Sequence, residues 1–132
     1  MRYLIDTDIA SYYLRGKFNL SDVFDNKGVD QIRLSVVSLS ELEVLAFRNP
    51  QSKINLSSIA LFAQKLGILN LDIRTWRMFS EMKASLLSVG KVRGDFDILI
   101  ATIARRHGLI MVTNNVAHYD GLSVPVENWV SP

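Results

Sequence analysis

Short apolar runs alternate with amphipathic helical stretches along the chain, and this alternation limits the folds that it can adopt. Strands are expected at residues 3–5, 32–36, 69–73, 109–113 and 124–126. Apolar residues recur with a helical period at 9–14, 20–24, 42–46, 56–66, 76–86 and 98–104. Strands that alternate with helices predict a three-layer α/β/α domain with a central, mainly parallel sheet. The final strand contains Pro125, which cannot donate to a ladder, so it is expected at an edge.

Polar residues and glycines mark the expected ends of the helices. Ser38 and Glu41 form an S-x-x-E capping box before an apolar stripe, and Asn55 is expected to cap the next helix. Glycines at 67, 90 and 108 are expected to close helices, and residues 91–94 form the clearest loop of the second half. No linker or repeat interrupts this order, so residues 1–132 are expected to form a single domain.

The composition excludes several classes of protein. The chain is 48% hydrophobic and 21% charged, which is typical of an ordered globular protein, and its net charge of +2 permits nucleic-acid binding without requiring it. It has no cysteine and two histidines, so any metal is expected to bind mainly through oxygen. The start of the chain lacks a signal-peptide pattern, and no segment approaches the roughly 20 apolar residues of a membrane span. A cytoplasmic protein is expected.

Three acidic residues are far apart in the sequence, yet each is expected at the end of a strand or the start of a helix. They are Asp6, Glu41 and Asp97. In open parallel sheets, ligands bind beyond the carboxyl ends of the strands. If the fold brings the three carboxylates together, they repel one another unless they are protonated or neutralised by a hard divalent cation. The sequence therefore predicts a candidate metal site.

Helix capping competes with metal binding as an explanation of these acids. Asp6 or Asp8 could cap the helix that follows. Glu41 is also explained by its capping box. Glu43 is about 200° away around the same helix, so only one of the two glutamates is expected to face the cluster.

The segment before the third acid offers further candidates. Asp97 opens an almost entirely apolar helix, and Asp95 could cap that helix instead, which favours Asp97 as a ligand. Lys91 and Arg93 precede them on the loop and are candidates for contacts with RNA phosphates. Residues 105–107 are better explained as cations at a helix C-terminus.

Four motifs in this order resemble those of PIN-domain ribonucleases, and most closely those of VapC toxins. They are Asp6-Thr7-Asp8-Ile9, Ser38-x-x-Glu41-Leu42, the run from Gly94-Asp95-Phe96-Asp97 to Ala101, and Val112-Thr113-Asn114-Asn115. The resemblance extends from the first strand to Trp129. It implies a PIN-like fold and a Mg²⁺- or Mn²⁺-dependent endoribonuclease, with RNA as substrate and a cognate VapB-like antitoxin as partner. It also implies a homodimer.

The resemblance assigns roles to individual residues. Asp6, Glu41 and Asp97 match the family's catalytic, metal-binding acids, which favours Glu41 over Glu43, and Thr113 matches a small polar residue that supports the cluster. Asn115 departs from the pattern, because many members have a fourth carboxylate there. Asp8, at a position that is often asparagine, and Asp95 are the expected substitutes for this missing charge.

Two other functions compete with a nuclease. A receiver-like signalling domain would also bind Mg²⁺ through clustered carboxylates, but it needs a lysine after a late strand, where this chain has Asn114 and Asn115. A catalytically degenerate PIN-like module that only binds RNA or protein is suggested by Asn115. The three matched acids favour the nuclease.

Overall fold

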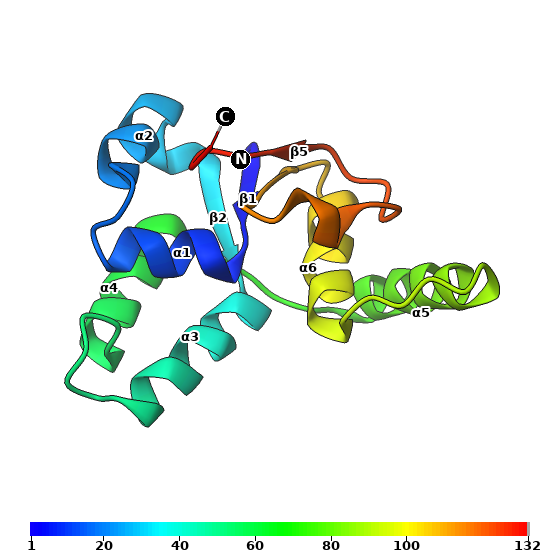
Figure 1. Cartoon of the computed structure of the whole chain (residues 1–132), viewed down its shortest axis with the longest axis horizontal. Coiled ribbons are helices and arrows are strands. Elements are labelled where there is room, and N and C mark those ends of the chain that lie inside the picture. Colours follow the sequence, from blue (N-terminus) through cyan, green and yellow to red (C-terminus); the bar gives the residue numbers. More distant parts are fainter. Residues whose placement is uncertain (132) are drawn as a thin grey trace.

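The computed structural model describes residues 1–131 and contains a five-stranded sheet in the order β3-β2-β1-β4-β5, with every neighbouring pair parallel (Figure 1). The strands are β1 (Tyr3–Ile5), β2 (Ile32–Ser35), β3 (Ile68–Leu69), β4 (Ile110–Val112) and β5 (Val126–Glu127). The helices are α1 (Thr7–Leu14), α2 (Leu20–Lys27), α3 (Val36–Arg48), α4 (Leu56–Leu66), α5 (Ile73–Ser88) and α6 (Asp95–Arg106). Two short 3₁₀ helices, η1 (Val29–Gln31) and η2 (Val116–Tyr119), complete these elements. The predicted parallel α/β fold is confirmed.

Helices cover both faces of the sheet. Side chains of successive strand residues point to opposite faces, so Tyr3 and Ile5 pack into one core and Leu4 into the other. Residues of α1, α2 and α4 fill the first core, whereas α5 and α6 fill the second, as their places on either side of the sheet in Figure 1 indicate. The three-layer prediction is therefore confirmed. No helix within residues 1–131 is long and apolar enough to cross a membrane.

The register of the central strands determines where the candidate site lies. Ile5 at the end of β1 pairs with Leu34 on one side and Val112 on the other. The next residues along the three strands, Asp6, Ser35 and Thr113, therefore meet at the carboxyl edge of the sheet. Ligands of parallel α/β proteins bind at this edge.

The predicted capping box of α3 is wrong. Ser35 caps the helix, because its Oγ accepts a hydrogen bond from the backbone N–H of Ser38 at 3.0 Å. Val36, predicted as the end of the strand, begins the helix, and Glu41 lies beyond the first turn of that helix. Capping therefore does not account for Glu41.

Other predicted boundaries also differ from the structure. The strand expected at 69–73 is limited to Ile68–Leu69, because Asp72 caps α5 and Ile73 begins it. Helix α6 begins at Asp95, with Gly94 at the capping position, so Asp95 is not the cap. The predicted edge strand exists but occupies Val126–Glu127.

Candidate active site

Asp6 caps a helix and also lies at the centre of the polar edge of the sheet. Its Oδ1 accepts from the backbone N–H of Ile9 at 2.9 Å, which fixes the start of α1. Its Oδ2 accepts from the hydroxyl of Thr113 at 2.6 Å, which joins the ends of β1 and β4. Helix capping and a role in the acidic cluster are therefore compatible for Asp6, because Oδ1 caps α1 and Oδ2 faces the end of β4.

The environment of Asp6 disfavours its negative charge. Asp6 is only 5% exposed, and burial raises its pKa to about 6, with further increases from Asp8 and Asp97. The hydrogen bonds from Thr113 and Ile9 lower the pKa but do not offset burial. No lysine, arginine or histidine within residues 1–131 forms an ion pair with Asp6. A bound cation would supply this missing compensation.

Glu41 is held against the first turn of α1. Its Oε1 accepts from the hydroxyl of Thr7 at 2.5 Å, and Thr7 Oγ1 lies 2.9 Å from Oγ of the buried Ser38. Thr7 directly follows Asp6, so this contact brings Glu41 to the same edge of the sheet. Glu43 makes no side-chain hydrogen bond or ion pair within the described part of the chain.

Asp97 and Asp95 lie in the same turn of α6 but have different surroundings. Asp97 is partly buried; burial raises its pKa, and Asp8 raises it further, whereas His118 lowers it. Asp95 is exposed and pairs with Lys83 of α5 at 2.5 Å. The structure therefore places Asp97 near the other acids and directs Asp95 to α5.

Residues of η2 that sequence reasoning did not select also reach the cluster. Nδ1 of His118 lies 3.5 Å from Oδ2 of Asp97. Tyr119 is buried, and its pKa is raised first by burial and then by Asp6, Asp97, Asp8 and Glu41, so its phenol stays protonated beside the acids. The available signal for His118 was weak: it is one of two histidines and follows Asn115 by three positions.

Asn115 and Asp8 occupy the rim of the cluster. The backbone N–H of Asn115 donates to Thr113 Oγ1 at 2.9 Å, and its side-chain Nδ2 lies 3.0 Å from Nε2 of His118. Asp8 is exposed in the first turn of α1 and raises the pKa of Asp6 and Asp97 through its charge.

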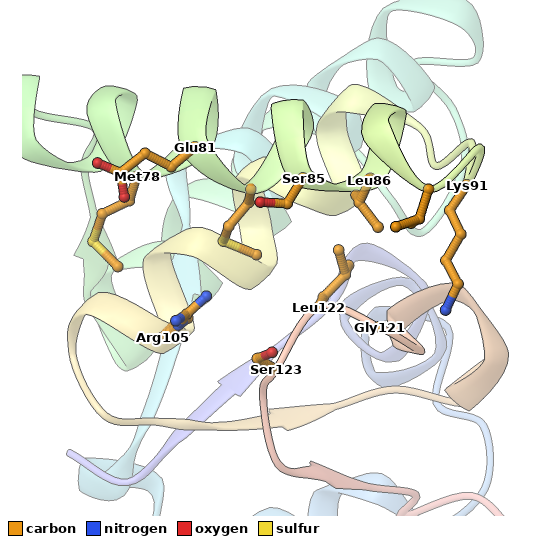
Figure 2. A pocket seen from close by; sticks show the side chains of 11 residues that line it. Met78, Glu81, Ser85, Leu86, Lys91, Arg105, Gly121, Leu122 and Ser123 are labelled. Carbon is orange, nitrogen blue, oxygen red and sulfur yellow. The ribbon is translucent and has the colours of Figure 1, made fainter.

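The two predicted phosphate contacts lie beside the loop at residues 120–123. Lys91 lines a pocket of about 430 Å³ between α5 and this loop, together with Leu86, Arg105 and Leu122 (Figure 2). Arg93 donates to the carbonyl of Asp120 at 3.3 Å. None of the candidate acids lines this pocket. The acidic cluster is therefore separate from it.

The available donors fit a hard divalent cation. They are carboxylates, hydroxyls and an amide, which offer the oxygen ligands that Mg²⁺ prefers. Within residues 1–131, no group of three or more acidic or histidine side chains is already close enough to enclose an ion. Water and substrate phosphate would complete the coordination, as is usual for Mg²⁺.

Comparison with known proteins identifies the same fold and a consistent activity. Residues 3–120 match the PIN domain family. The chain is 30% identical over 132 residues to Ribonuclease VapC2 of Haemophilus influenzae, covering 98% of this chain and 99% of that protein. It is 29% identical over 137 residues to the tRNA(fMet)-specific endonuclease VapC of Shigella flexneri, covering 98% of each.

Solved structures agree with the fold. VapBC2 from Rickettsia felis, bound to a DNA fragment from its promoter, contains a chain that matches with a TM-score of 0.82 and 24% identity, covering 98% of this chain and 99% of that one. VapBC-1 from nontypeable Haemophilus influenzae matches with a TM-score of 0.82 and 21% identity, covering 98% of each chain. At these identities the likeness concerns the fold alone.

Proposed function

Since the chain belongs to the PIN-domain family and, within it, to the VapC ribonucleases, we propose that it is a Mg²⁺- or Mn²⁺-dependent endoribonuclease that a cognate antitoxin neutralises. One observation carries the metal dependence. Asp6 is buried beside Asp8 and Asp97, and no cation of residues 1–131 pairs with it. A divalent ion would offset the cost of burying the Asp6 charge and its repulsion by the charges of Asp8 and Asp97.

Asp6, Glu41 and Asp97 are the residues that would hold the ion. When bound, the ion supplies a water of lowered pKa and offsets negative charge on the scissile phosphate. Thr113 fixes Asp6 and Thr7 fixes Glu41 through their hydroxyls, so two of the three carboxylates are oriented before the ion arrives. Metal binding requires the ionised form of Asp6. Because the pKa of Asp6 is raised to about 6, metal binding below that pH must displace its proton.

The substrate we propose is structured RNA, with tRNA as the first to test. Two similar proteins, from Shigella flexneri and Salmonella typhimurium, are named tRNA(fMet)-specific endonucleases, at 29% and 24% identity. Lys91 and Arg93 are the proposed contacts for the RNA backbone, because they are basic residues on the loop before α6.

A cleavage assay tests this function. Purified protein is incubated with tRNA in Mg²⁺ or Mn²⁺, in EDTA, and as the Asp97→Asn variant. Cleavage is expected only with the metal and the intact Asp97, and hydrolysis by a metal-activated water predicts products with 5′-phosphate and 3′-hydroxyl ends. Asp95→Asn is the matched control, because Asp95 lies two positions away in the same helix but pairs with Lys83. Cleavage that persists equally in EDTA and in Asp97→Asn contradicts the proposal.

The same assay decides whether the chain is a degenerate binding module. An active wild-type protein removes this alternative. If the wild type is inactive and Asn115→Asp creates activity, the degenerate module is supported.

The antitoxin is proposed by similarity to proteins whose solved structures are VapBC complexes. The test is co-expression with a small open reading frame adjacent to the gene of this protein. The two products are expected to co-purify, and the complex is expected to lack nuclease activity. Full activity in such a complex contradicts this part of the proposal.

A homodimer is proposed from the resemblance to VapC toxins. Light scattering of the isolated protein at micromolar concentration is expected to give twice the mass of 14.9 kDa. A monomer throughout that range contradicts it.

A further inference from the structure

Both ring nitrogens of His118 face residues of the candidate active site. Nδ1 lies 3.5 Å from Oδ2 of Asp97, and Nε2 lies 3.0 Å from Nδ2 of Asn115. The short helix that carries His118 packs against α6, which carries Asp97. His118 thus lies between Asp97 and Asn115. Many members of the family have a fourth carboxylate at the position of Asn115.

The distance between His118 and Asp97 suits two ligands of one ion better than a hydrogen bond. A strong N–H···O bond spans about 2.7 to 3.2 Å, so 3.5 Å is long. Ligand atoms that each lie about 2.1 Å from a shared ion are separated by about 3 to 3.5 Å. The pair is already at the upper end of this separation, and the side chain of His118 is 55% exposed, which leaves it free to adjust.

Asn115 can select the form of His118 that binds metal. With Nδ2 directed at Nε2, the amide is the donor, and a neutral ring then carries its hydrogen on Nδ1, facing Asp97. Turning the amide by 180° exchanges Nδ2 for Oδ1 without moving the backbone. Oδ1 then accepts from Nε2–H, and Nδ1 presents its lone pair towards Asp97. A metal-binding histidine usually donates its other N–H to an oxygen in this way.

We propose that His118 is a nitrogen ligand of the ion held by Asp97, oriented by Asn115, and that the site consequently selects Mn²⁺ over Mg²⁺. This inference rests on the proposed metal-dependent function. Mg²⁺ takes oxygen ligands and loses its waters reluctantly. Mn²⁺ also favours oxygen ligands, but as a first-row transition ion it accepts an imidazole nitrogen more readily than Mg²⁺ does. A histidine at this position therefore strengthens Mn²⁺ binding and adds little for Mg²⁺. It also compensates for the carboxylate that Asn115 does not provide.

Pulsed electron paramagnetic resonance on the Mn²⁺-loaded protein tests the ligand directly. The wild type is expected to show the ¹⁴N modulation of a Mn²⁺-bound imidazole, which His118→Gln abolishes. His107→Gln is the matched control, since His107 is the other histidine of the chain and follows the opposite end of α6. It is expected to retain the signal. Bound Mn²⁺ without ¹⁴N modulation, or modulation that persists in His118→Gln, overturns the inference and leaves the proposed function intact.

Metal titrations by calorimetry test the selectivity. His118→Gln is expected to weaken Mn²⁺ binding about tenfold or more, and Mg²⁺ binding by less than about twofold; Asn115→Ala is expected to reproduce part of the Mn²⁺ loss. Equal losses for the two ions overturn the selectivity. If neither ion binds the wild type, or if Asp97→Asn binds as tightly as the wild type, the proposed metal function fails together with the inference.

Discussion

Asp6 and Asp72 cap helices through the same kinds of hydrogen bond, yet the pKa of Asp6 is raised and the pKa of Asp72 is lowered. Each carboxylate accepts from a backbone N–H three residues later, at 2.9 Å in both cases. Each also accepts from a threonine hydroxyl, at 2.6 Å from Thr113 and 2.8 Å from Thr75. The local chemistry of capping therefore does not distinguish them.

The difference lies first in burial and then in the surrounding charge. Asp72 is exposed and pairs with Arg106 at 2.6 Å; its pKa is lowered, first by the N–H and hydroxyl of Thr75 and then by Arg106. Asp6 is buried near Asp8 and Asp97, and its pKa is raised to about 6. Capping and the ion pair with Arg106 account for Asp72, whereas capping leaves the charge of Asp6 uncompensated. An acid that caps a helix without a counter-charge is thus a candidate for ligand binding.

The largest expected difference between the two caps is in catalysis. Asp6→Asn keeps a good capping side chain but removes the charge that would bind the ion, so RNA cleavage is expected to fall roughly a thousandfold or more, equivalent to several kcal/mol. Asp72→Asn is expected to cleave within about twofold of the wild type. Initial rates on one labelled tRNA compare them. Comparable losses in both variants would mean that Asp6 acts only through the fold.

The next effect is on stability, with opposite signs at the two positions. In the metal-free protein at pH 7.5, Asp6→Asn is expected to raise the free energy of unfolding by about 1 to 3 kcal/mol, because it removes a buried carboxylate whose pKa burial raises to about 6. Asp72→Asn is expected to lower it, because it weakens the pair with Arg106. Urea unfolding measures both. A decrease in the free energy of unfolding for Asp6→Asn would contradict a destabilising effect of the buried Asp6 charge.

The raised pKa of Asp6 also predicts how pH acts on the wild type. The folded protein holds the Asp6 proton more tightly than the unfolded chain, so this group's stabilising contribution is present below pH 3.8 and is lost as pH rises through about 6. Metal binding requires the ionised form and is expected to weaken roughly tenfold for each pH unit below 6. Calorimetry of Mg²⁺ or Mn²⁺ binding between pH 5 and 7.5 measures this trend. Affinity that is constant over that range would refute it.

The smallest expected effect comes from the threonines that support the two caps. Thr113→Val removes the hydroxyl donor to Asp6, which raises the pKa of Asp6 further and is expected to weaken metal binding about tenfold. Thr75→Val makes the same change at Asp72 and is expected to leave metal affinity unchanged. Both side chains are fully buried, so the pair also controls for the loss of a buried hydroxyl. Equal metal affinities in the two variants would contradict the supporting role of Thr113.

Much of the fold and the position of Asp6 could be predicted from the sequence, because both depend on local order. The alternation of strands and helices predicts a parallel sheet, and Asp6 directly follows a strand that such a sheet buries. The predicted capping box failed because Ser35 has the same capping chemistry as Ser38 and lies three residues earlier. Sequence alone does not decide between two serines when the end of the neighbouring strand sets the start of the helix.

The remaining details of the site depend on contacts between distant elements. The sequence favours Asp97 over Asp95 by assigning Asp95 to the helix cap. Gly94 is the cap instead, and the packing of α5 beside α6 brings Lys83 to Asp95. His118 gave no motif signal, because its approach to Asp97 depends on how η2 folds back after β4. Tertiary packing therefore decides which side chains join the cluster.

A calorimetric titration of Mn²⁺ into the wild type, Asp6→Asn and Asp72→Asn at pH 7.5 measures whether the buried charge of Asp6 binds a divalent ion. We expect the uncompensated charge of Asp6 to bind a divalent ion, whereas the charge of Asp72 is compensated by Arg106 and stabilises the fold. Equal affinities are expected for the wild type and Asp72→Asn, and at least tenfold weaker binding is expected for Asp6→Asn. Affinities that are the same in all three proteins would contradict this expectation.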